Sequence, residues 1–322
     1  MTKSNDDKLV NISIGNHNVA GIADFIDLLL FDLREVGRIP ILSNQFMPTN
    51  YNVVIEAFDA DMVRVIKKSF SKNDPRLIMI ATEIVKDGLL DSASPSPEED
   101  VDGWYDATAD HWVERTNNFF EIVEYFGHII CVSEEIYNSL TALNLKAKLV
   151  YWKPRFTGMR EIFERGEEFF KNYWISQNVK HTKTHRLMFS GSLTPYRTEQ
   201  IDKLVDAGET VLVCKQDTPH NVRYEFSRQS GLSFGPKHYR STVQLSKMRL
   251  LWCLNNFFPI IMQDCQGKTD LDPYCVFYRD EDDLLTKCAD MNSTYFECLT
   301  KNFQFCCDTA KTNSPFTEIL EG

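Results

Sequence analysis

One short turn combines the residue types best suited to hold an anion: a glycine, neighbouring serines and an arginine. Gly191 and Ser192 follow the apolar residues 187–189, and Arg197 lies just inside a helix that begins at Pro195, a residue favoured at the first helical position. Backbone amides of such a turn and the positive end of the helix dipole can bind an anion, and an arginine adds a fixed charge. The turn therefore predicts a phosphate site, although an ordinary strand, turn and helix of an α/β domain has the same pattern.

The elements around this turn alternate between strands and helices, which is typical of parallel βαβ units. Strands are expected at residues 9–15, 41–43, 51–58, 76–82, 127–133, 148–152, 187–189, 210–214, 259–262 and 276–278. Helices are expected at residues 23–36, 61–70, 112–126, 159–175, 195–207, 243–254, 282–291 and 293–309, and the last of them is expected to cross back to the first half. The first α/β half closes near residue 155, residues 156–184 form a helix and hinge, and residues 185–322 form the second half.

Three side chains of the first half lie at or near the carboxyl ends of expected strands, where α/β sheets place ligand groups. They are His17, Glu83 and Glu56. Their positions allow them to converge on one crevice. A single histidine at a strand end more often has a structural role, so His17 can equally be part of the framework.

The composition is that of a soluble globular protein of 322 residues with a formal charge of −11. This excess of acid argues against a protein that holds a nucleic-acid backbone by bulk electrostatics. No segment is apolar enough to span a membrane or to serve as a signal peptide. The nine cysteines, an odd number without CxxC spacing, indicate a reducing, cytoplasmic compartment, and no His and Cys cluster at the spacing of a zinc site.

Residues 91–106 are rich in serine, proline and acid and predict a surface loop. Its Asp100, Asp102 and Asp106 fit either a cation site or a solvated loop, and the solvated loop is favoured because acidic runs without ordered geometry usually face water. The aromatic pair at 104–105 fits either stacking on a sugar or a small hydrophobic cluster.

Three segments of the second half resemble a known family in their order and spacing. They are FSGSLTPYRTEQIDKLVDAGETVLV, HYRSTVQLSKMRLLWCLNNFFPIIMQD and CVFYRDEDDLLTKCADM. Together they resemble the nucleotide-sugar-binding domain of GT-B glycosyltransferases, and among these the CgeB-like, spore-maturation group. The resemblance covers about residues 185–292, while the first half matches only in outline. It implies an α/β fold of two Rossmann-like domains facing across a cleft, with an acceptor domain at residues 1–155 and a donor domain at residues 185–322.

The resemblance also implies which residues contact the donor. Gly191, Ser192 and Arg197 would lie beside the donor diphosphate, Ser241, Lys247 and Arg249 would face the nucleotide or its phosphates, and Asp264 would lie near the sugar. Lys247 and Arg249 are two positions apart on the expected helix, so they cannot point at the same ligand group, and Arg249 fits the family pattern better. Arg197→Ala is expected to abolish donor binding with little loss of stability.

One residue departs from the family pattern. Members usually carry a glutamate that holds the ribose hydroxyls three residues after the arginine, and here that position is Trp252. A tryptophan on this helix is expected to pack in the core. The departure leaves open an altered donor or a domain without catalytic activity.

The leading hypothesis is therefore a metal-independent transferase that moves a hexosyl or pentosyl group from a nucleotide-sugar donor and uses no further cofactor. Amides and basic side chains would stabilise the leaving diphosphate. An inverting transferase would also need a general base, for which His17 is the first candidate, followed by Glu83 and Glu56. A retaining transferase can work without one, and the sequence does not decide between the two. The acceptor, whether saccharide, lipid-linked glycan or protein, and the oligomeric state do not follow from the sequence. The alternatives are a non-catalytic binding or regulatory protein of the same fold and a sugar transferase acting on modified nucleic-acid bases.

Overall fold

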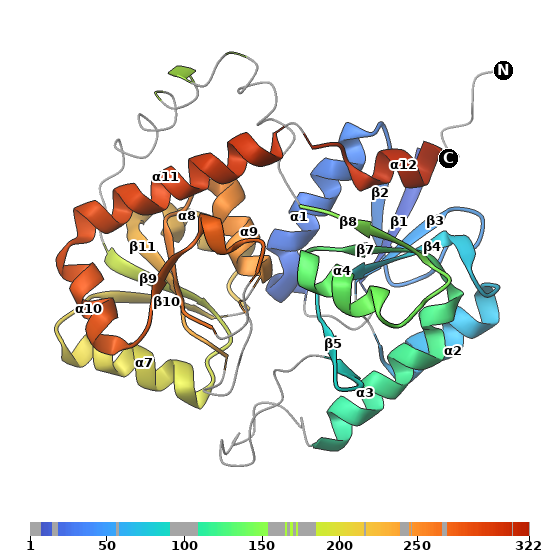
Figure 1. Cartoon of the computed structure of the whole chain (residues 1–322), viewed down its shortest axis with the longest axis horizontal. Helices are drawn as coiled ribbons and strands as arrows, with labels where there is room; N and C mark the ends of the chain where they lie inside the picture. Colours follow the sequence, from blue (N-terminus) through green and yellow to red (C-terminus); the bar gives the residue numbers. More distant parts are fainter. Residues whose placement is uncertain are drawn as a thin grey trace.

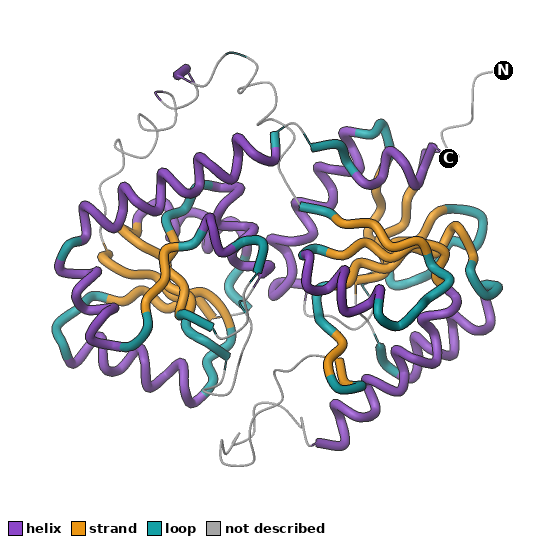
Figure 2. Tube along the Cα trace, in the orientation of Figure 1, coloured by secondary structure: helices purple, strands orange, loops and turns teal. Residues whose placement is uncertain are grey.

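The computed structural model contains two parallel β-sheets, each covered by helices (Figures 1 and 2). The structure describes residues 8–14, 19–55, 58–90, 109–153, 165, 168–169, 172, 185–215, 217–238, 245, 247–265, 269–310 and 312–321. The expected hinge helix at 159–175 lies largely outside these residues, and the loop at 91–106 lies wholly outside them.

The first sheet has six strands in the order β2-β1-β3-β4-β7-β8, and every pairing is parallel. The strands are β1 (Leu9–Ser13), β2 (Ile39–Ser43), β3 (Tyr51–Ile55), β4 (Asp74–Ala81), β7 (Phe126–Cys131) and β8 (Lys148–Tyr151). The helices are α1 (Val19–Glu35), α2 (Ala60–Ser69), α3 (Ala109–Ile122) and α4 (Glu134–Thr141), with a 3-10 turn, η2 (Val123–Tyr125), before β7. A short antiparallel hairpin, β5 (Val85–Lys86) and β6 (Leu89–Leu90), follows β4.

The second sheet has five strands in the order β10-β9-β11-β12-β13, again all parallel. The strands are β9 (His185–Gly191), β10 (Val211–Lys215), β11 (Ser230–Gly235), β12 (Ile260–Gln263) and β13 (Val276–Tyr278). The helices are α7 (Pro195–Asp206), α8 (His220–Gln229), α9 (Lys247–Asn256), α10 (Glu281–Ala289), α11 (Met291–Thr309) and α12 (Pro315–Glu321), and the 3-10 turn η3 (Asp272–Tyr274) precedes β13.

The two strand orders share one feature that decides where ligands bind. In each sheet the chain starts at an inner strand, adds one strand on one side and then continues on the other side, so the direction of winding reverses beside the first strand. Open α/β sheets bind ligands at the carboxyl ends of the strands that flank this reversal. The fold therefore points to the ends of β1 and β3 in the first sheet and of β9 and β11 in the second.

An apolar interface joins the two halves. The larger cluster of buried apolar side chains runs from the first sheet through α9 to α11 and α12, and the smaller cluster lies under the second sheet. Helix α1 of the first half contacts α8 and α9 of the second, and Figure 1 shows these helices between the two sheets. The sheets are thus two Rossmann-like domains with a shared boundary at α1, α8 and α9.

The chain returns to the first domain at its end, through a later helix than the sequence predicts. Helix α11 packs against the second domain, where the thiol of Cys298 donates to the carbonyl of Ile260 at 3.4 Å. Helix α12 instead lies on the first domain, with Phe316 in edge contact with Trp152 at 5.9 Å between ring centroids. None of the described helices combines the length and apolar character needed to cross a membrane.

Candidate functional site

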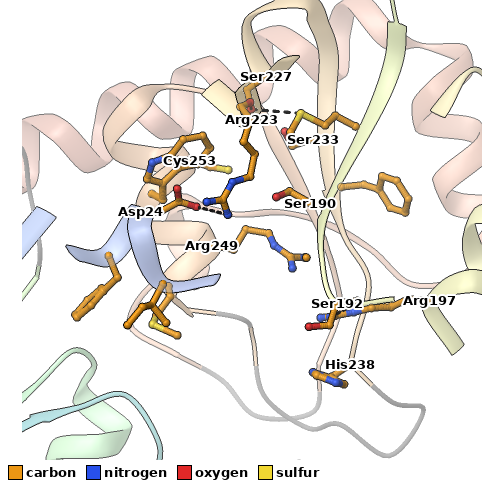
Figure 3. Close-up of a pocket in the computed structure, with 17 residues that line it drawn as sticks. Asp24, Ser190, Ser192, Arg197, Arg223, Ser227, Ser233, His238, Arg249 and Cys253 are labelled. Atoms are coloured by element: carbon orange, nitrogen blue, oxygen red, sulfur yellow. Dashed lines mark hydrogen bonds and ion pairs between the residues drawn. The ribbon is translucent and has the colours of Figure 1, made fainter. Parts of the chain in front are cut away.

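A cavity of about 200 Å³ lies at the carboxyl end of β9, where residues of β11, α1, α7, α8 and α9 also line it (Figure 3). Met188 and Ser190 line it from β9, and the alternate residues Leu187 and Phe189 belong to the apolar cluster of the second domain. This alternation follows from the period of two in a strand. The cavity thus occupies the reversal point of the second sheet, as the strand order requires.

The cavity is rich in positive charge although the chain is acidic. Among the described residues, three arginines and one aspartate line it, namely Arg197, Arg223, Arg249 and Asp24. The remaining titratable ring, that of His238, is neutral near pH 7, because burial and the two nearby guanidinium groups of Arg197 and Arg249 lower its pKa to about 3. Guanidinium groups therefore outnumber carboxylates here, and the site favours a dianion.

Arg197 is fixed by backbone carbonyl groups. Its side chain is 4% exposed, Nε donates to the carbonyl of Lys237 at 3.1 Å, Nη1 to that of Ser192 at 3.0 Å and Nη2 to that of Pro236 at 3.4 Å. Thr194 caps the helix, since its hydroxyl accepts from the amide of Arg197 at 3.3 Å. The guanidinium therefore ties the turn after β9 to the segment after β11.

This arrangement corrects one expectation. Arg197→Ala was expected to leave the stability nearly unchanged, because a phosphate-contacting arginine would stand outside the core. The buried guanidinium and its three carbonyl partners make Arg197 part of the folded framework. Its removal would leave buried acceptors without donors, which destabilises a fold.

Arg249 differs in having a buried donor without a partner. Among the residues that the structure describes, its Nη1 has no hydrogen-bond partner. Burial lowers the pKa of the guanidinium to about 10, which leaves it charged at neutral pH. Its position depends on Gly191, where φ is +141° and a Cβ atom would lie 2.0 Å from Nη2 of Arg249. Glycine therefore supplies both the backbone conformation and the space that this arginine needs.

Lys247 and Arg249 point to different partners, as their spacing on α9 predicts. The Nζ of Lys247 lies 3.3 Å from Oε2 of Glu135 at the start of α4, across the domain boundary. Arg249 lines the cavity and Lys247 does not. Of the two basic residues, Arg249 is the one placed to meet a ligand there.

The other expected site residues fall into three groups. Gly191 and Ser192 line the cavity. Asp264 follows β12, where its amide donates to the carbonyl of Tyr278 at 2.8 Å, and it does not line the cavity. Glu83 follows β4 and forms an ion pair with Arg115 of α3. His17, Glu56 and Ser241 lie outside the described residues, as do Asp100, Asp102, Asp106 and the aromatic pair at 104–105.

Trp252 is a core residue, which confirms the expectation of packing. It is 3% exposed, its ring lies 5.1 Å from that of Phe258, and it makes an edge contact with His220 at 6.0 Å. It forms part of the cavity wall. The family pattern places a glutamate at position 252, whereas the carboxylate among the described residues of this cavity is that of Asp24 in the first domain.

Sequence reasoning missed Arg223, Asp24 and His238. Arg223 lies on α8, a polar helix with no clear apolar stripe, so neither the helix nor its role was predicted. Asp24 and Asp27 are the charged residues in the apolar first turns of α1, and a buried acid in such a helix indicates a cationic partner. Nη1 of Arg223 lies 3.1 Å from Oδ2 of Asp24.

Neither metal ligation nor disulfide formation is indicated in the part of the chain that the structure describes. No group of three or more His, Cys, Asp or Glu side chains there could hold a metal ion. All nine cysteines are free thiols. Burial raises the pKa of Cys253, which lines the cavity, to about 12, so its thiol stays protonated near neutral pH.

No protein-family model matches the chain, and no curated protein matches it. Among solved structures, it is similar to a variant of the wall teichoic acid polymerase TagF at 8% identity and a TM-score of 0.44, over 99% of this chain and 91% of that one. It is also similar to a UDP-forming α,α-trehalose-phosphate synthase from Burkholderia xenovorans at 8% identity and a TM-score of 0.44, over 92% of this chain and 78% of that one. At these scores the similarities identify no activity, and the α/β assignment follows from the strand order of the two sheets.

Proposed function

We propose that the chain transfers a sugar from a nucleotide-sugar donor to an acceptor, and that the donor diphosphate binds in the cavity at β9. The observation that carries this proposal is a cavity at the reversal point of a parallel sheet, lined by three arginines and one aspartate in a chain with a net charge of −11. A diphosphate is the part of a nucleotide sugar whose charge matches this lining. The two Rossmann-like domains agree with the architecture that the sequence resemblance implies.

Arg249 is proposed as the main ligand of the diphosphate. Breaking the glycosidic bond adds negative charge to the leaving nucleoside diphosphate, and a preorganised guanidinium stabilises that charge without a metal ion. The Nη1 donor that lacks a partner is available for this bond, and the pKa of about 10 keeps the group protonated. Gly191 and Ser192 would approach the diphosphate with their backbone, while Arg197 holds the turn in shape.

The acceptor is proposed to bind on the first domain, with His17, Glu83 and Glu56 as candidates for the general base. His17 stays the first of these because a base that titrates near neutral pH best suits proton transfer. The carboxylate of Glu83 is held by Arg115, and it would act on an acceptor only after leaving that ion pair. Substituting each residue separately and measuring transfer to the acceptor, once one is found, distinguishes the three.

The proposal is tested by measuring nucleoside diphosphate release from a panel of UDP-, GDP-, ADP- and CDP-sugars. We expect the chain to consume one class of donor, at the same rate in EDTA as in magnesium. Arg249→Gln should lower the rate, and Lys247→Gln, which removes a charge from the same helix, should not. If none of the donors bound to the chain and none released a nucleoside diphosphate, the proposal would be contradicted.

A non-catalytic nucleotide-binding or regulatory protein is the second candidate, and one observation favours it. The cavity of about 200 Å³ is smaller than the roughly 300–1,000 Å³ of typical small-molecule sites, and the core residue Trp252 forms part of its wall. This candidate predicts tight binding of a nucleoside diphosphate together with no release from any nucleotide sugar. The same panel, followed by calorimetry, separates the two.

A further inference from the structure

An ionic cluster connects the two domains at one side of the cavity. Asp24 and Asp27 of α1 face His220 and Arg223 of α8. Nη1 of Arg223 lies 3.1 Å from Oδ2 of Asp24, while Nε2 of His220 lies 3.3 Å from Oδ1 of Asp24 and its Nδ1 3.3 Å from Oδ2 of Asp27. Figure 3 shows Asp24 reaching from the first domain to Arg223, with Arg249 below them.

The contact between Asp24 and Arg223 is buried, and such a contact stabilises a fold only weakly. The side chain of Arg223 is 4% exposed and that of Asp24 is 15% exposed. Removing both charges from water offsets most of their attraction. Accordingly, burial raises the pKa of Asp24 even though Arg223 and His220 act to lower it. A ligand that offers more negative charge than one carboxylate can therefore compete with Asp24 for Arg223.

The position of Arg223 makes this exchange possible. Arg223, Asp24 and Arg249 line the same cavity, and the positive charge of Arg223 lowers the pKa of Arg249, which is the mark of two cations close to each other. One carboxylate cannot neutralise both guanidinium groups, whereas a dianion between them can. A phosphate also offers several acceptor oxygens, so that both arginines can donate to it.

We propose that Arg223 is a second phosphate ligand of this cavity and that Asp24 is an internal competitor for it, so that a bound phosphate group breaks the contact between α1 and α8. The inference rests on the proposed function in so far as the phosphate belongs to the sugar donor. Arg223 thereby couples donor binding to the boundary between the domains. The apolar interface and the contact of Lys247 with Glu135 still join the domains when the Asp24 contact breaks.

The test is calorimetric titration of the full chain with inorganic pyrophosphate. Asp24→Asn should bind pyrophosphate about tenfold more tightly than the unmodified chain, which corresponds to about 1.4 kcal/mol. Arg223→Gln should bind it more weakly, and adding Asp24→Asn to Arg223→Gln should give no further gain. Asp27→Asn is the matched control, because Asp27 contacts His220 but does not line the cavity, and it should leave the affinity within about twofold of the unmodified chain.

Two results overturn the inference. The first is that Asp24→Asn binds pyrophosphate no more tightly than the unmodified chain, or that neither protein binds it. The second is that Arg223→Gln binds pyrophosphate as tightly as the unmodified chain. Melting temperatures and near-UV circular dichroism check that each variant is folded, and Asp24→Ser replaces Asp24→Asn if the latter does not fold. The donor panel separates this inference from the proposed function. If the variants bound pyrophosphate in the expected order of affinity but no nucleoside diphosphate was released from any donor, the competition between Asp24 and phosphate would stand and the proposed transferase activity would be rejected. If a donor was consumed but Asp24→Asn did not tighten pyrophosphate binding, the transferase activity would stand and the competition would be rejected.

Discussion

Helices α7 and α9 form two walls of the cavity, and each places an arginine against the ring of Phe189. The guanidinium carbon lies 5.6 Å from the ring centroid in Arg197 and 5.2 Å in Arg249. Every nitrogen of the Arg197 guanidinium donates to a carbonyl, whereas Nη1 of Arg249 has no partner in the described part of the chain. Two arginines that contact the same ring are therefore assigned different roles: we propose that the α7 wall shapes the site and that the α9 wall contacts the ligand.

The difference originates in what each helix faces. Arg197 lies in the first turn of α7, within reach of the carbonyls of residues 236 and 237. Arg249 faces Gly191, whose missing side chain leaves space but offers no acceptor to Nη1.

The largest effect is expected for the packing that holds the α9 wall in place. Trp252→Ala should lower the free energy of unfolding by about 3–5 kcal/mol, because it removes a buried aromatic side chain from contact with Phe258 and His220. Urea denaturation measures the loss, and Phe296→Ala, at a ring that is 54% exposed, is the control and should change little. A Trp252→Ala protein as stable as the unmodified one would show that α9 is not anchored in this way.

The α7 wall should also respond in stability. Arg197→Ala should lower the free energy of unfolding by about 2–4 kcal/mol, since buried carbonyls lose a charged donor. The control is Arg64→Ala at an exposed ion pair with Asp61, for which a change below about 1 kcal/mol is expected. If Arg197→Ala abolished nucleotide binding at undiminished stability, the roles assigned to the two walls would be reversed.

Gly191→Ala tests the contact between the turn and the α9 wall. The added Cβ would displace the guanidinium of Arg249, and a side chain at a φ of +141° strains the backbone by about 1–3 kcal/mol. We expect weaker binding of nucleoside diphosphates and a moderate loss of stability. Gly208→Ala separates these effects, because Gly208 has a φ of +88° with no atom near its Cβ position, and it should lose stability alone. Equal affinity in the two variants would disprove the contact.

The last expected effect is a pH dependence from His238, whose ring lies near both Arg197 and Arg249. Its pKa is about 3 in the folded chain and about 6.5 when unperturbed, so the unfolded chain takes up a proton that the folded chain does not. The stabilisation is present above pH 6.5 and is lost as the pH falls toward 3. Urea denaturation at pH 7 and at pH 4.5 measures the free energy of unfolding, and His238→Gln should lose less of it between these two pH values than the unmodified chain does. His128, whose pKa burial also lowers, contributes equally to both proteins and cancels.

The sequence predicted most elements whose apolar pattern is strong. The central strands β4 and β7 contain the apolar runs Leu77–Ala81 and Ile129–Cys131, which are buried on both faces, and both strands were expected within a few residues. Helix α8 was missed because only two of its side chains are buried and these, Arg223 and Ser227, are polar. The resemblance to the CgeB-like group stays a prediction.

The candidate site was predicted only where a local pattern marks it. Gly191, Ser192 and Arg249 belong to segments with a recognisable order, and the structure brings them to one cavity. Asp24 joins that cavity from a helix far away in sequence, and only the tertiary fold decides that it meets Arg223. In the same way, the sequence around Arg197 does not reveal that its guanidinium donates hydrogen bonds to the carbonyls of residues 236 and 237.

The most direct test of the central claim is the affinity of nucleoside diphosphates for Arg249→Gln, Lys247→Gln and the unmodified chain, measured by calorimetry in EDTA. A hydrogen bond between charged groups contributes about 1.5–3 kcal/mol, so Arg249→Gln should bind roughly 10- to 100-fold more weakly. Lys247→Gln removes the same charge from the same helix but faces Glu135, and its affinity should stay within about threefold of the unmodified chain. Equal affinity of Arg249→Gln and the unmodified chain would contradict the assignment of this cavity as the donor site.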